Sequence, residues 1–313
     1  MDNRVICVVG PTACGKTKMG VALAQRFGGE VVSVDSMQIY RRMDIGTAKP
    51  SPEERQGIPH HMIDVAEPWE DYSVSRYCAD AAPIVEDIVS RGKTAIIAGG
   101  TGLYMDSLIR GNDFAPFPST GVRERLEREA DREGMEALLA RLRAVDPEGA
   151  ARLHLSDRKR IIRAMEVYLE TGETITAHNR RTQALPPRFS PVWLGLDFES
   201  RAELYSRIDR RVDEMVRRGL LQEVQALLDG GLPRDATALQ AIGYKQFLAV
   251  ADGTATADQA VEEVKLRSRQ YAKRQLTWLR RNPAIHWIYW DKEPDFPAAL
   301  QNATDFLTAH GLG

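Results

Sequence analysis

An eight-residue stretch near the start of the chain constrains its fold more than any other feature. Residues 10–17 read Gly-Pro-Thr-Ala-Cys-Gly-Lys-Thr, which matches the P-loop pattern G-x-x-x-x-G-K-[ST] at every fixed position. An apolar run at residues 5–9 precedes the motif, and a stretch with helical spacing at residues 16–27 follows it. Since strand, glycine-rich loop and helix are the context that this motif requires, the stretch predicts an α/β fold that binds a diphosphate or a triphosphate.

The residue types of the motif explain why it holds phosphate. Its glycines let the backbone turn so that N–H groups point at phosphate oxygens, and the following helix N-terminus adds partial positive charge. Lys16 is placed to reach the terminal phosphate, and the Thr17 hydroxyl is a candidate ligand for Mg²⁺. The candidate phosphate-binding residues are Gly10, Pro11, Thr12, Ala13, Cys14, Gly15, Lys16 and Thr17. The motif does not name the reaction, because kinases, other NTPases and some transferases share it.

Bulk composition excludes several classes of protein. The 313 residues carry a formal net charge of −2, so nucleic acid or membrane must be met by local patches rather than by the whole molecule. No signal peptide is visible, and no apolar stretch approaches the ~20 residues that a membrane span needs. We therefore expect a soluble cytoplasmic protein, and a monomer because no exposed heptad seam is present.

The order of expected elements divides the chain into three parts. Apolar runs at 5–9, 31–34 and 94–98 alternate with helical patterns, which is typical of a parallel sheet with crossover helices. Charged helices without a strand signal follow, before a further strand at 192–196 and an edge strand at 285–289. The predicted fold is α/β, a P-loop NTPase-like parallel sheet core with a helical insertion domain and a helical C-terminal part. Its expected segments are residues 1–114, 115–190 and 191–313.

Polar residues follow the predicted strands at the points where ligands bind in such sheets. Gly10, Asp35 and the run Gly99-Gly100-Thr101 each come directly after a strand, so they should converge on one cleft. Asp35 has three interpretations: a magnesium ligand, a general base, or a cap for the turn that follows. The segment 35–40, which is polar except at Met37 and Ile39, suits either a small acceptor molecule or the edge of a nucleobase.

Two basic clusters stand out against the nearly neutral total. One spans residues 152–163, and the other spans 265–281, which contains no acidic residue but includes Tyr271 and Trp278. Basic residues interleaved with aromatic ones suit a phosphodiester backbone and unstacked bases. A solvated helix face is the alternative for either cluster alone, but two clusters in the two helical regions favour an RNA-binding track.

Taken together, the motifs resemble one family, the bacterial tRNA dimethylallyltransferases, also called tRNA isopentenyltransferases. The matching segments run in the family's order and cover nearly the whole chain. They are residues 10–17, 34–50, 58–65, 99–108, 157–168, 241–247 and 269–281. One departure is Cys14, which stands where family members usually have Ser, and it should be neutral because the neighbouring backbone makes the contacts.

The resemblance implies a reaction and a set of site residues. A dimethylallyl group would pass from dimethylallyl diphosphate to N6 of the adenosine 3′-adjacent to the anticodon, with Mg²⁺ as cofactor and diphosphate as the product. Asp35 would be the general base, Thr101 would help hold the amine, and the P-loop with Arg207 would grip the diphosphate. The adenine would leave its stack to reach the cleft.

The resemblance also implies contacts with the anticodon stem-loop, with the helical insertion acting as a clamp that moves when RNA binds. The implied tRNA-binding residues are Asp35, Ser36, Met37, Gln38, Thr101, Arg123, Lys159, Arg160, Ile161, Ile162, Arg163, Gln240, Ala241, Ile242, Gly243, Tyr244, Lys245, Lys273, Arg274, Gln275, Leu276, Thr277, Trp278, Leu279 and Arg280.

Two alternatives remain from the residues alone. A P-loop kinase of a small molecule, using ATP and Mg²⁺, accounts for residues 10–17 and Asp35 but leaves both basic clusters without a role. An RNA-binding NTPase module accounts for the basic clusters but not for the loop at residues 99–104.

Overall fold

A computed structural model describes residues 3–112, 120–292 and 294–312 of the chain. The chain forms two compact units: unit 1 comprises residues 1–111 and 188–313, and unit 2 comprises residues 112–187. Unit 2 is the helical insertion that the sequence predicts. Unit 2 ends at residue 187 and a strand of unit 1 begins at Ser190, where the sequence analysis places the end of the insertion. The predicted boundary at residues 114 and 115 lies outside the described residues.

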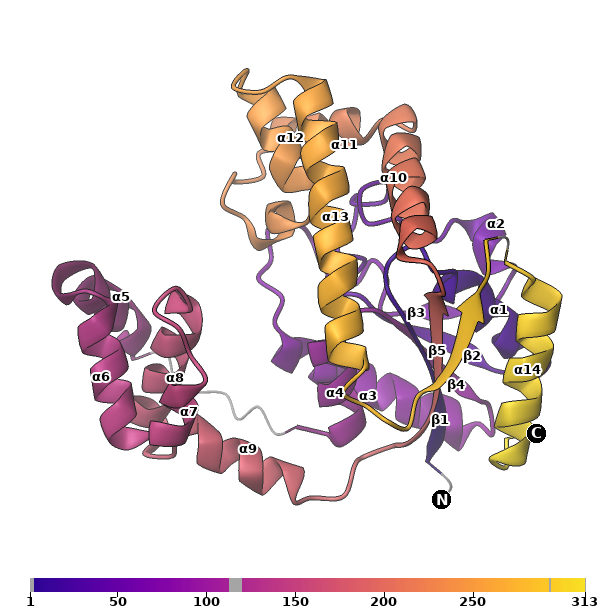
Figure 1. The fold of residues 1–313 in the computed structure, drawn as a ribbon, viewed down its shortest axis with the longest axis horizontal. Helices are drawn as coiled ribbons and strands as arrows, with labels where there is room; N and C mark the ends of the chain where they lie inside the picture. Colours follow the sequence, from indigo (N-terminus) through magenta and orange to yellow (C-terminus); the bar gives the residue numbers. More distant parts are fainter. Residues whose placement is uncertain (1–2, 113–119, 293, 313) are drawn as a thin grey trace. The chain divides into compact units, whose positions relative to one another are not determined.

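Unit 1 is built on a six-stranded sheet with the order β3-β2-β4-β1-β5-β6 (Figure 1). Every neighbouring pair is parallel, as the alternation of strands and helices predicts. The strands are β1 (Arg4–Val9), β2 (Glu30–Val34), β3 (His60–His61), β4 (Ala95–Gly99), β5 (Ser190–Phe198) and β6 (His286–Trp290). The two-residue strand β3 gives no apolar run, so the sequence offers no signal for it.

Helices of unit 1 lie on both faces of the sheet and extend beyond its carboxyl edge (Figure 1). Their bounds are α1 (Lys16–Arg26), α2 (Pro52–Arg55), α3 (Val74–Ser90), α4 (Gly102–Arg110), α10 (Arg201–Arg217), α11 (Leu220–Asp229), α12 (Tyr244–Ala251), α13 (Ala257–Leu279) and α14 (Phe296–Ala309), with a 3₁₀ turn at Thr237–Gln240. The sequence predicted most of them but missed the short α2 and also α4, which begins within the glycine-rich run after β4. The long helix α13 starts in a capping box between Thr256 and Gln259.

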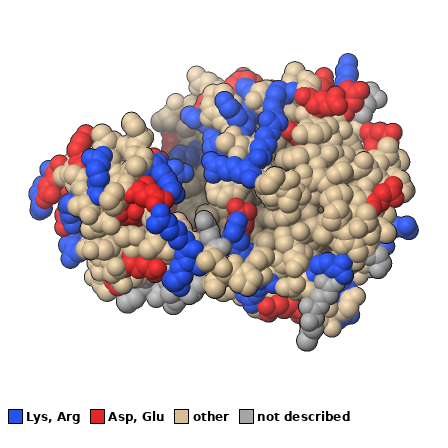
Figure 2. All heavy atoms as spheres, turned by 60° about the horizontal axis from the view of Figure 1, so that its bottom comes forward, with Lys and Arg blue, Asp and Glu red and all other residues tan. Residues whose placement is uncertain are grey.

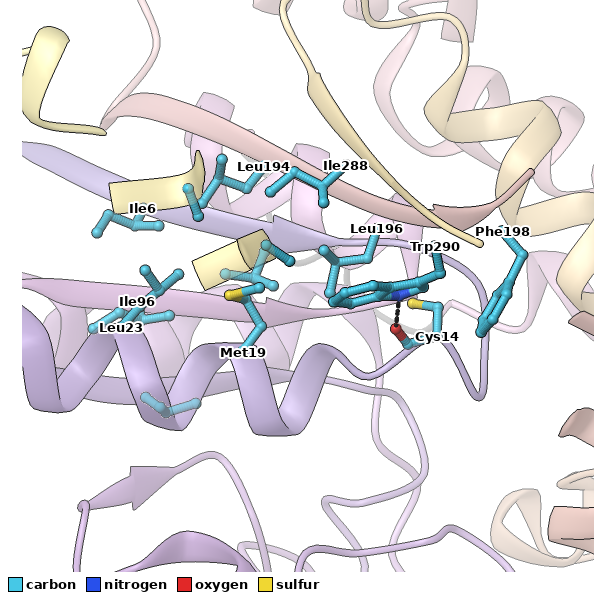
Figure 3. Packing of buried hydrophobic residues seen from close by; sticks show 14 of the residues in the cluster. Ile6, Cys14, Met19, Leu23, Ile96, Leu194, Leu196, Phe198, Ile288 and Trp290 are labelled. Atoms are coloured by element: carbon cyan, nitrogen blue, oxygen red, sulfur yellow. Dashed lines mark hydrogen bonds between the residues drawn. The ribbon is translucent and has the colours of Figure 1, made fainter. Parts of the chain in front are cut away.

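The core beneath the P-loop joins both ends of the chain (Figure 3). Its buried side chains come from the central strands, from α1 and from α14, and they include Ile6, Val8, Met19, Leu23, Leu194, Leu196, Ile288 and Leu307. Trp290 reaches from β6 to the P-loop, where its indole Nε1 donates a hydrogen bond to the carbonyl oxygen of Cys14 at 2.7 Å. The loop is therefore fixed by a residue near the C-terminal end of the sequence.

Unit 2 contains helices and no strand among its described residues, and it has a core of its own. Its helices are α5 (Val122–Glu133), α6 (Met135–Val145), α7 (Pro147–Ala151), α8 (Arg158–Thr171) and α9 (Ile175–Gln183). Val122, Leu126, Leu138, Leu142, Ile161, Ile162 and Met165 are among the side chains buried within it. Across the described parts of both units, every helix is too short or too polar to span a lipid bilayer.

A buried carboxylate fastens β2 to its surroundings. The side chain of Glu30 is 5% exposed and accepts hydrogen bonds from Arg91 and from Lys93 Nζ, and it also contacts His61 Nε2 at 2.8 Å. These partners, Arg91 first, hold the pKa of Glu30 well below its usual range, against the opposing effect of burial. A carboxyl whose pKa is lowered by folding stabilises the folded state above its unfolded pKa, and this stabilisation is lost as the pH falls through the folded value.

We expect Glu30→Gln to lower the free energy of unfolding at pH 7 by about 1.5–3 kcal/mol, because it removes charge-assisted hydrogen bonds. The difference from the parent protein should shrink as the pH falls below about 4, because Glu30 then takes up a proton in the unfolded parent chain while the folded carboxyl stays ionised. Urea unfolding at several pH values measures both effects. Glu199→Gln, at an exposed carboxylate, is the control. A difference that stays constant with pH would contradict this account.

Candidate active site

Two cavities lie at the carboxyl edge of the sheet in unit 1. The larger, of about 600 Å³, is lined by the P-loop, by the ends of β2 and β4 and by arginines of α10. The smaller, of about 300 Å³, is lined by segments 35–37 and 46–48 and by α10, α13 and residues 240–242. The residues that line both are Thr12, Asp35, Thr47, Ala48, Arg211 and Tyr271. The two cavities therefore share a wall, and Asp35 is part of it.

The P-loop adopts the turned backbone that its glycines permit. Gly10 has φ +152° and Gly15 has φ +95°, and a Cβ on Gly10 would lie 2.3 Å from the carbonyl oxygen of Leu196. The Lys16 ammonium donates to the carbonyl oxygen of Pro11 at 2.6 Å. The N–H of Thr12 is engaged by a side chain of α13, so the loop's other N–H groups are the ones left for phosphate oxygens.

Two cations converge on the larger cavity. Burial lowers the pKa of Lys16, and the nearby charge of Arg211 lowers it further. Burial likewise lowers the pKa of the Arg211 guanidinium, which the carboxylate of Asp35 opposes. Desolvated cations that face each other favour a polyanionic ligand, because such a ligand offsets the cost of holding them charged.

The sequence identified Arg207 of α10 as a diphosphate clamp but missed Arg211. Arg207, the predicted clamp, lies at the P-loop with its Nε 3.5 Å from the carbonyl oxygen of Ala13, and its guanidinium is 5.3 Å from the ring centroid of Phe198. Arg211 lies one turn further along α10 and lines both cavities. The signal was present in the sequence, because residues four apart on a helix share a face.

The carboxylate of Asp35 is held by the turn that follows it. Its Oδ1 accepts hydrogen bonds from the backbone N of Met37 at 2.9 Å and of Gln38 at 3.3 Å. Within the described part of the chain, Oδ2 has no hydrogen-bond partner. Asp35 therefore caps the turn, as one of its three interpretations proposed, and keeps one oxygen for a ligand. Thr101 lies beside this turn and accepts from the backbone N of Ser36 at 3.4 Å.

Tyr271 is a residue of this site that the sequence analysis assigned only to a basic cluster. It lines both cavities from α13. Burial raises the pKa of its hydroxyl to about 12, and the nearby charge of Asp35 contributes to the increase. The phenol therefore stays protonated near neutral pH, and its hydroxyl lies within hydrogen-bonding reach of Thr101 and Gln275. No periodicity separates such a tyrosine from a core aromatic residue, so the sequence did not reveal it.

The predicted tRNA-binding runs straddle buried and exposed helix faces. In unit 2, Lys159 and Arg160 are exposed, whereas Arg123 and Arg163 each approach Glu166 to 2.8 Å. In unit 1, Gln240, Lys245, Lys273, Arg274, Thr277 and Arg280 are exposed. The prediction of direct tRNA contact is not supported for the buried side chains of Ile161, Ile162, Ala241, Tyr244, Gln275, Leu276 and Leu279. A helix that packs on a core presents only part of each consecutive run to solvent.

Neighbouring acids neutralise charges of both basic clusters. The helical periodicity of residues 265–281, which should turn their leucines toward the core, instead predicts that most charges of that cluster are free. Lys265 and Arg269 of α13 form ion pairs with Asp213 and Asp209 of α10. Lys273 and Arg274 have no acidic partner within the described residues. On the visible face of unit 2, at the left of Figure 2, basic and acidic side chains are interspersed. Lys273 and Arg274 therefore form a local cationic surface on the C-terminal half of α13.

With the geometry established, comparisons with known proteins identify the family. The model of the IPP transferase family matches residues 38–282, and an isopentenyl transferase model matches residues 3–68. The tRNA dimethylallyltransferase of Caldanaerobacter subterraneus subsp. tengcongensis is 44% identical over 309 residues, which are 98% of each chain. The chain belongs to the tRNA dimethylallyltransferase family. This confirms the resemblance from the sequence and makes the chain a transferase rather than a kinase.

Solved structures agree with the family and with the fold. The tRNA isopentenylpyrophosphate transferase of Bacillus halodurans is 39% identical with a TM-score of 0.74, covering 98% of this chain and 96% of that one. A eukaryotic dimethylallyltransferase, captured acting on tRNA, is 29% identical with a TM-score of 0.81, covering 98% of this chain and 80% of that one. The P-loop NTPase-like core that the sequence predicted is confirmed.

One carboxylate fixes the loop at residues 44–50, which lines both cavities. Glu223 of α11 accepts hydrogen bonds from the backbone N of Asp44, Ile45 and Gly46 and from the Tyr244 hydroxyl. Several donors on one carboxylate make it a strong anchor, because an ionised carboxylate accepts at both oxygens.

Glu223→Gln should lower the free energy of unfolding by about 1–3 kcal/mol, because an amide nitrogen cannot accept and leaves backbone N–H groups unpaired. Denaturant unfolding measures the loss, with the exposed Glu199→Gln as the matched substitution. Equal stability of the two variants would show that the carboxylate does not anchor the loop.

Proposed function

We propose that this chain transfers a dimethylallyl group from dimethylallyl diphosphate to N6 of the adenosine 3′-adjacent to the anticodon of tRNA, releasing diphosphate. One observation carries the proposal: Asp35 lies on the wall shared by a cationic cavity and a smaller, less polar one. An acceptor base in the smaller cavity and a diphosphate in the larger would meet at this carboxylate. The relatives are named as dimethylallyltransferases that act on tRNA, which supports a dimethylallyl donor and a tRNA acceptor.

The larger cavity is suited to the diphosphate. Lys16, Arg207 and Arg211 would surround it together with N–H groups of the P-loop. As the bond between the allylic carbon and the diphosphate oxygen breaks, the electron pair leaves with the diphosphate, whose negative charge grows. Fixed cations in a site that excludes water stabilise this charge most strongly at the transition state.

Asp35 is suited to accept the proton. The N6 amine is a poor nucleophile because its lone pair is delocalised into the adenine ring. As nitrogen forms its bond to the allylic carbon, the N6 proton passes to Asp35 Oδ2, which no described residue occupies. The Thr101 hydroxyl, beside the same turn, would help hold the amine. The adenine reaches this position only if it leaves its stack.

The residues at the P-loop also fit a magnesium ion. Thr17 lines the larger cavity with an exposed side chain. Among the described residues, no three His, Cys, Asp or Glu side chains are grouped to hold a metal. Mg²⁺ is commonly held by substrate phosphates and water with few protein ligands, so the Thr17 hydroxyl and the diphosphate would hold it here. When bound, it would neutralise part of the charge of the leaving group.

The anticodon stem-loop would bind the exposed cations of the two units. Arg274 lines the smaller cavity, and Lys273 is its exposed neighbour on α13. In unit 2, Lys159 and Arg160 are exposed cations at the start of α8. Their contacts with phosphates position the tRNA, whereas residues 35–38 would meet the target base and its neighbours.

Asp35→Asn tests the base. Its amide oxygen still caps the turn, but it cannot take up the proton, so transfer should fall by about 10²- to 10⁴-fold while tRNA binding is kept. The assay incubates tRNA, dimethylallyl diphosphate and Mg²⁺ with the enzyme, then digests the tRNA and weighs its nucleosides. Asp235→Asn, at an exposed aspartate, is the control. Loss of transfer and of binding together would make Asp35 positional, and no prenylated adenosine with the parent enzyme would overturn the proposed function.

Arg211→Gln tests the diphosphate site. Losing a charge-assisted contact should raise the KM for dimethylallyl diphosphate by about 10- to 100-fold.

The lowered pKa of Lys16 gives a second test, in the parent enzyme. The affinity for inorganic diphosphate should begin to fall with rising pH before the pH reaches ~10.4, the pKa of an ordinary lysine. Calorimetric titration at several pH values measures the affinity. Arg234→Gln, which breaks an exposed ion pair with Asp252, should change neither the KM for dimethylallyl diphosphate nor the affinity for inorganic diphosphate.

A further inference from the structure

The side chain of Gln275 joins two loops of the site. It lies on α13 and is 6% exposed. Its Oε1 accepts a hydrogen bond from the backbone N of Thr12 at 2.9 Å, and its Nε2 donates to the carbonyl oxygen of Gly100 at 3.0 Å. Thr12 belongs to the P-loop, and Gly100 directly precedes Thr101. One amide group therefore connects the diphosphate loop with the loop that carries Thr101.

This contact depends on the residue types at both positions, glycine at 100 and glutamine at 275. A Cβ at residue 100 would lie 2.1 Å from Nε2 of Gln275, so the approach requires glycine. Only one orientation of the amide presents an acceptor to the N–H of Thr12 and a donor to the carbonyl of Gly100. An ionised glutamate lacks the donor, and an aliphatic side chain lacks both groups.

Gln275 belongs to a face of α13 that is directed at the site. Tyr271, four residues earlier, lines both cavities. Trp278, three residues later, donates from Nε1 to Asp106 Oδ2 at 2.9 Å, and its ring lies against Gly102 at the start of α4. This spacing places the three side chains on one helix face. The same face of α13 thus contacts the cavity wall, both loops and α4.

We propose that Gln275 is a positioning residue that sets the separation between the P-loop and the Thr101 loop for the transfer step. The inference rests on the proposed prenyl transfer. Gln275 lines the larger cavity, but both polar atoms of its amide hydrogen-bond to backbone, so we place its action in Thr12 and Gly100. Reacting atoms must approach to about 3–3.5 Å, and a misplacement of about 1 Å costs on the order of 100-fold in rate. Losing the amide therefore lowers kcat more than it weakens the binding of either substrate.

The test combines two variants whose kcat should depend differently on pH. Gln275→Leu removes both hydrogen bonds, so kcat should fall about 10- to 100-fold at every pH while KM for dimethylallyl diphosphate and Kd for tRNA change less than about threefold. Gln275→Glu has the missing donor only when its carboxyl is protonated, which burial favours. Its kcat should therefore recover relative to the parent enzyme as the pH falls from about 8 to about 5, a range in which proteins are commonly stable.

Gln270→Glu makes the same chemical change on the same helix, where the amide oxygen accepts from the exposed Arg267, and the ratio of its kcat to that of the parent should not vary with pH. A pH profile of Gln275→Glu that runs parallel to that of the parent, or an unchanged kcat in Gln275→Leu, overturns the inference. If the leucine variant fails to fold, as judged by thermal unfolding, the profile of the glutamate variant alone decides. A parent enzyme that transfers no prenyl group would refute the proposed function. This outcome differs from a failure of the positioning role, in which the parent enzyme is active.

Discussion

Parallel pairing within the sheet is the constraint on which the rest of this structure depends. β4 lies between β1 and β2, so the chain leaves all three strands at one edge. The P-loop, the Asp35 turn and the Thr101 loop meet there although the sequence separates them. The hydrogen bonds of the sheet thus set the approximate distances between the groups that would act on the two substrates. Side chains from other elements make the finer adjustments.

These adjustments come largely from the part of the chain after unit 2. Three side chains hydrogen-bond to the backbone of these loops: Trp290 of β6 to Cys14, Gln275 of α13 to Thr12, and Glu223 of α11 to residues 44–46. The N-terminal segment supplies most of the groups proposed to touch substrate, and the C-terminal segment fixes their positions. Each fixing contact uses a side-chain group on a backbone group, so the loops are held while most of their own side chains stay free for ligands.

The sequence predicted the sheet, the helical insertion and the convergence of Asp35 with the P-loop, because these depend on local periodicity and on a motif with fixed spacing. It did not predict the roles of Arg211, Tyr271 or Gln275, since their contacts join residues far apart in the chain. It also overestimated the free charge of α13, because Asp209 and Asp213 neutralise it from another helix. Runs such as residues 273–280 mix buried and exposed positions, which consecutive numbering does not separate.

The position of β5 has a consequence for how the chain folds during synthesis. β1 pairs with β5, whose register joins Arg4 to Ser190, so the central strand lacks one neighbour until the ribosome has made nearly two thirds of the protein. Such distant pairing slows folding and leaves strand edges open to wrong partners meanwhile. Unit 2, whose contacts are local, is complete before that moment. A nascent chain of this kind is therefore most exposed to aggregation just before the strand after the insertion emerges.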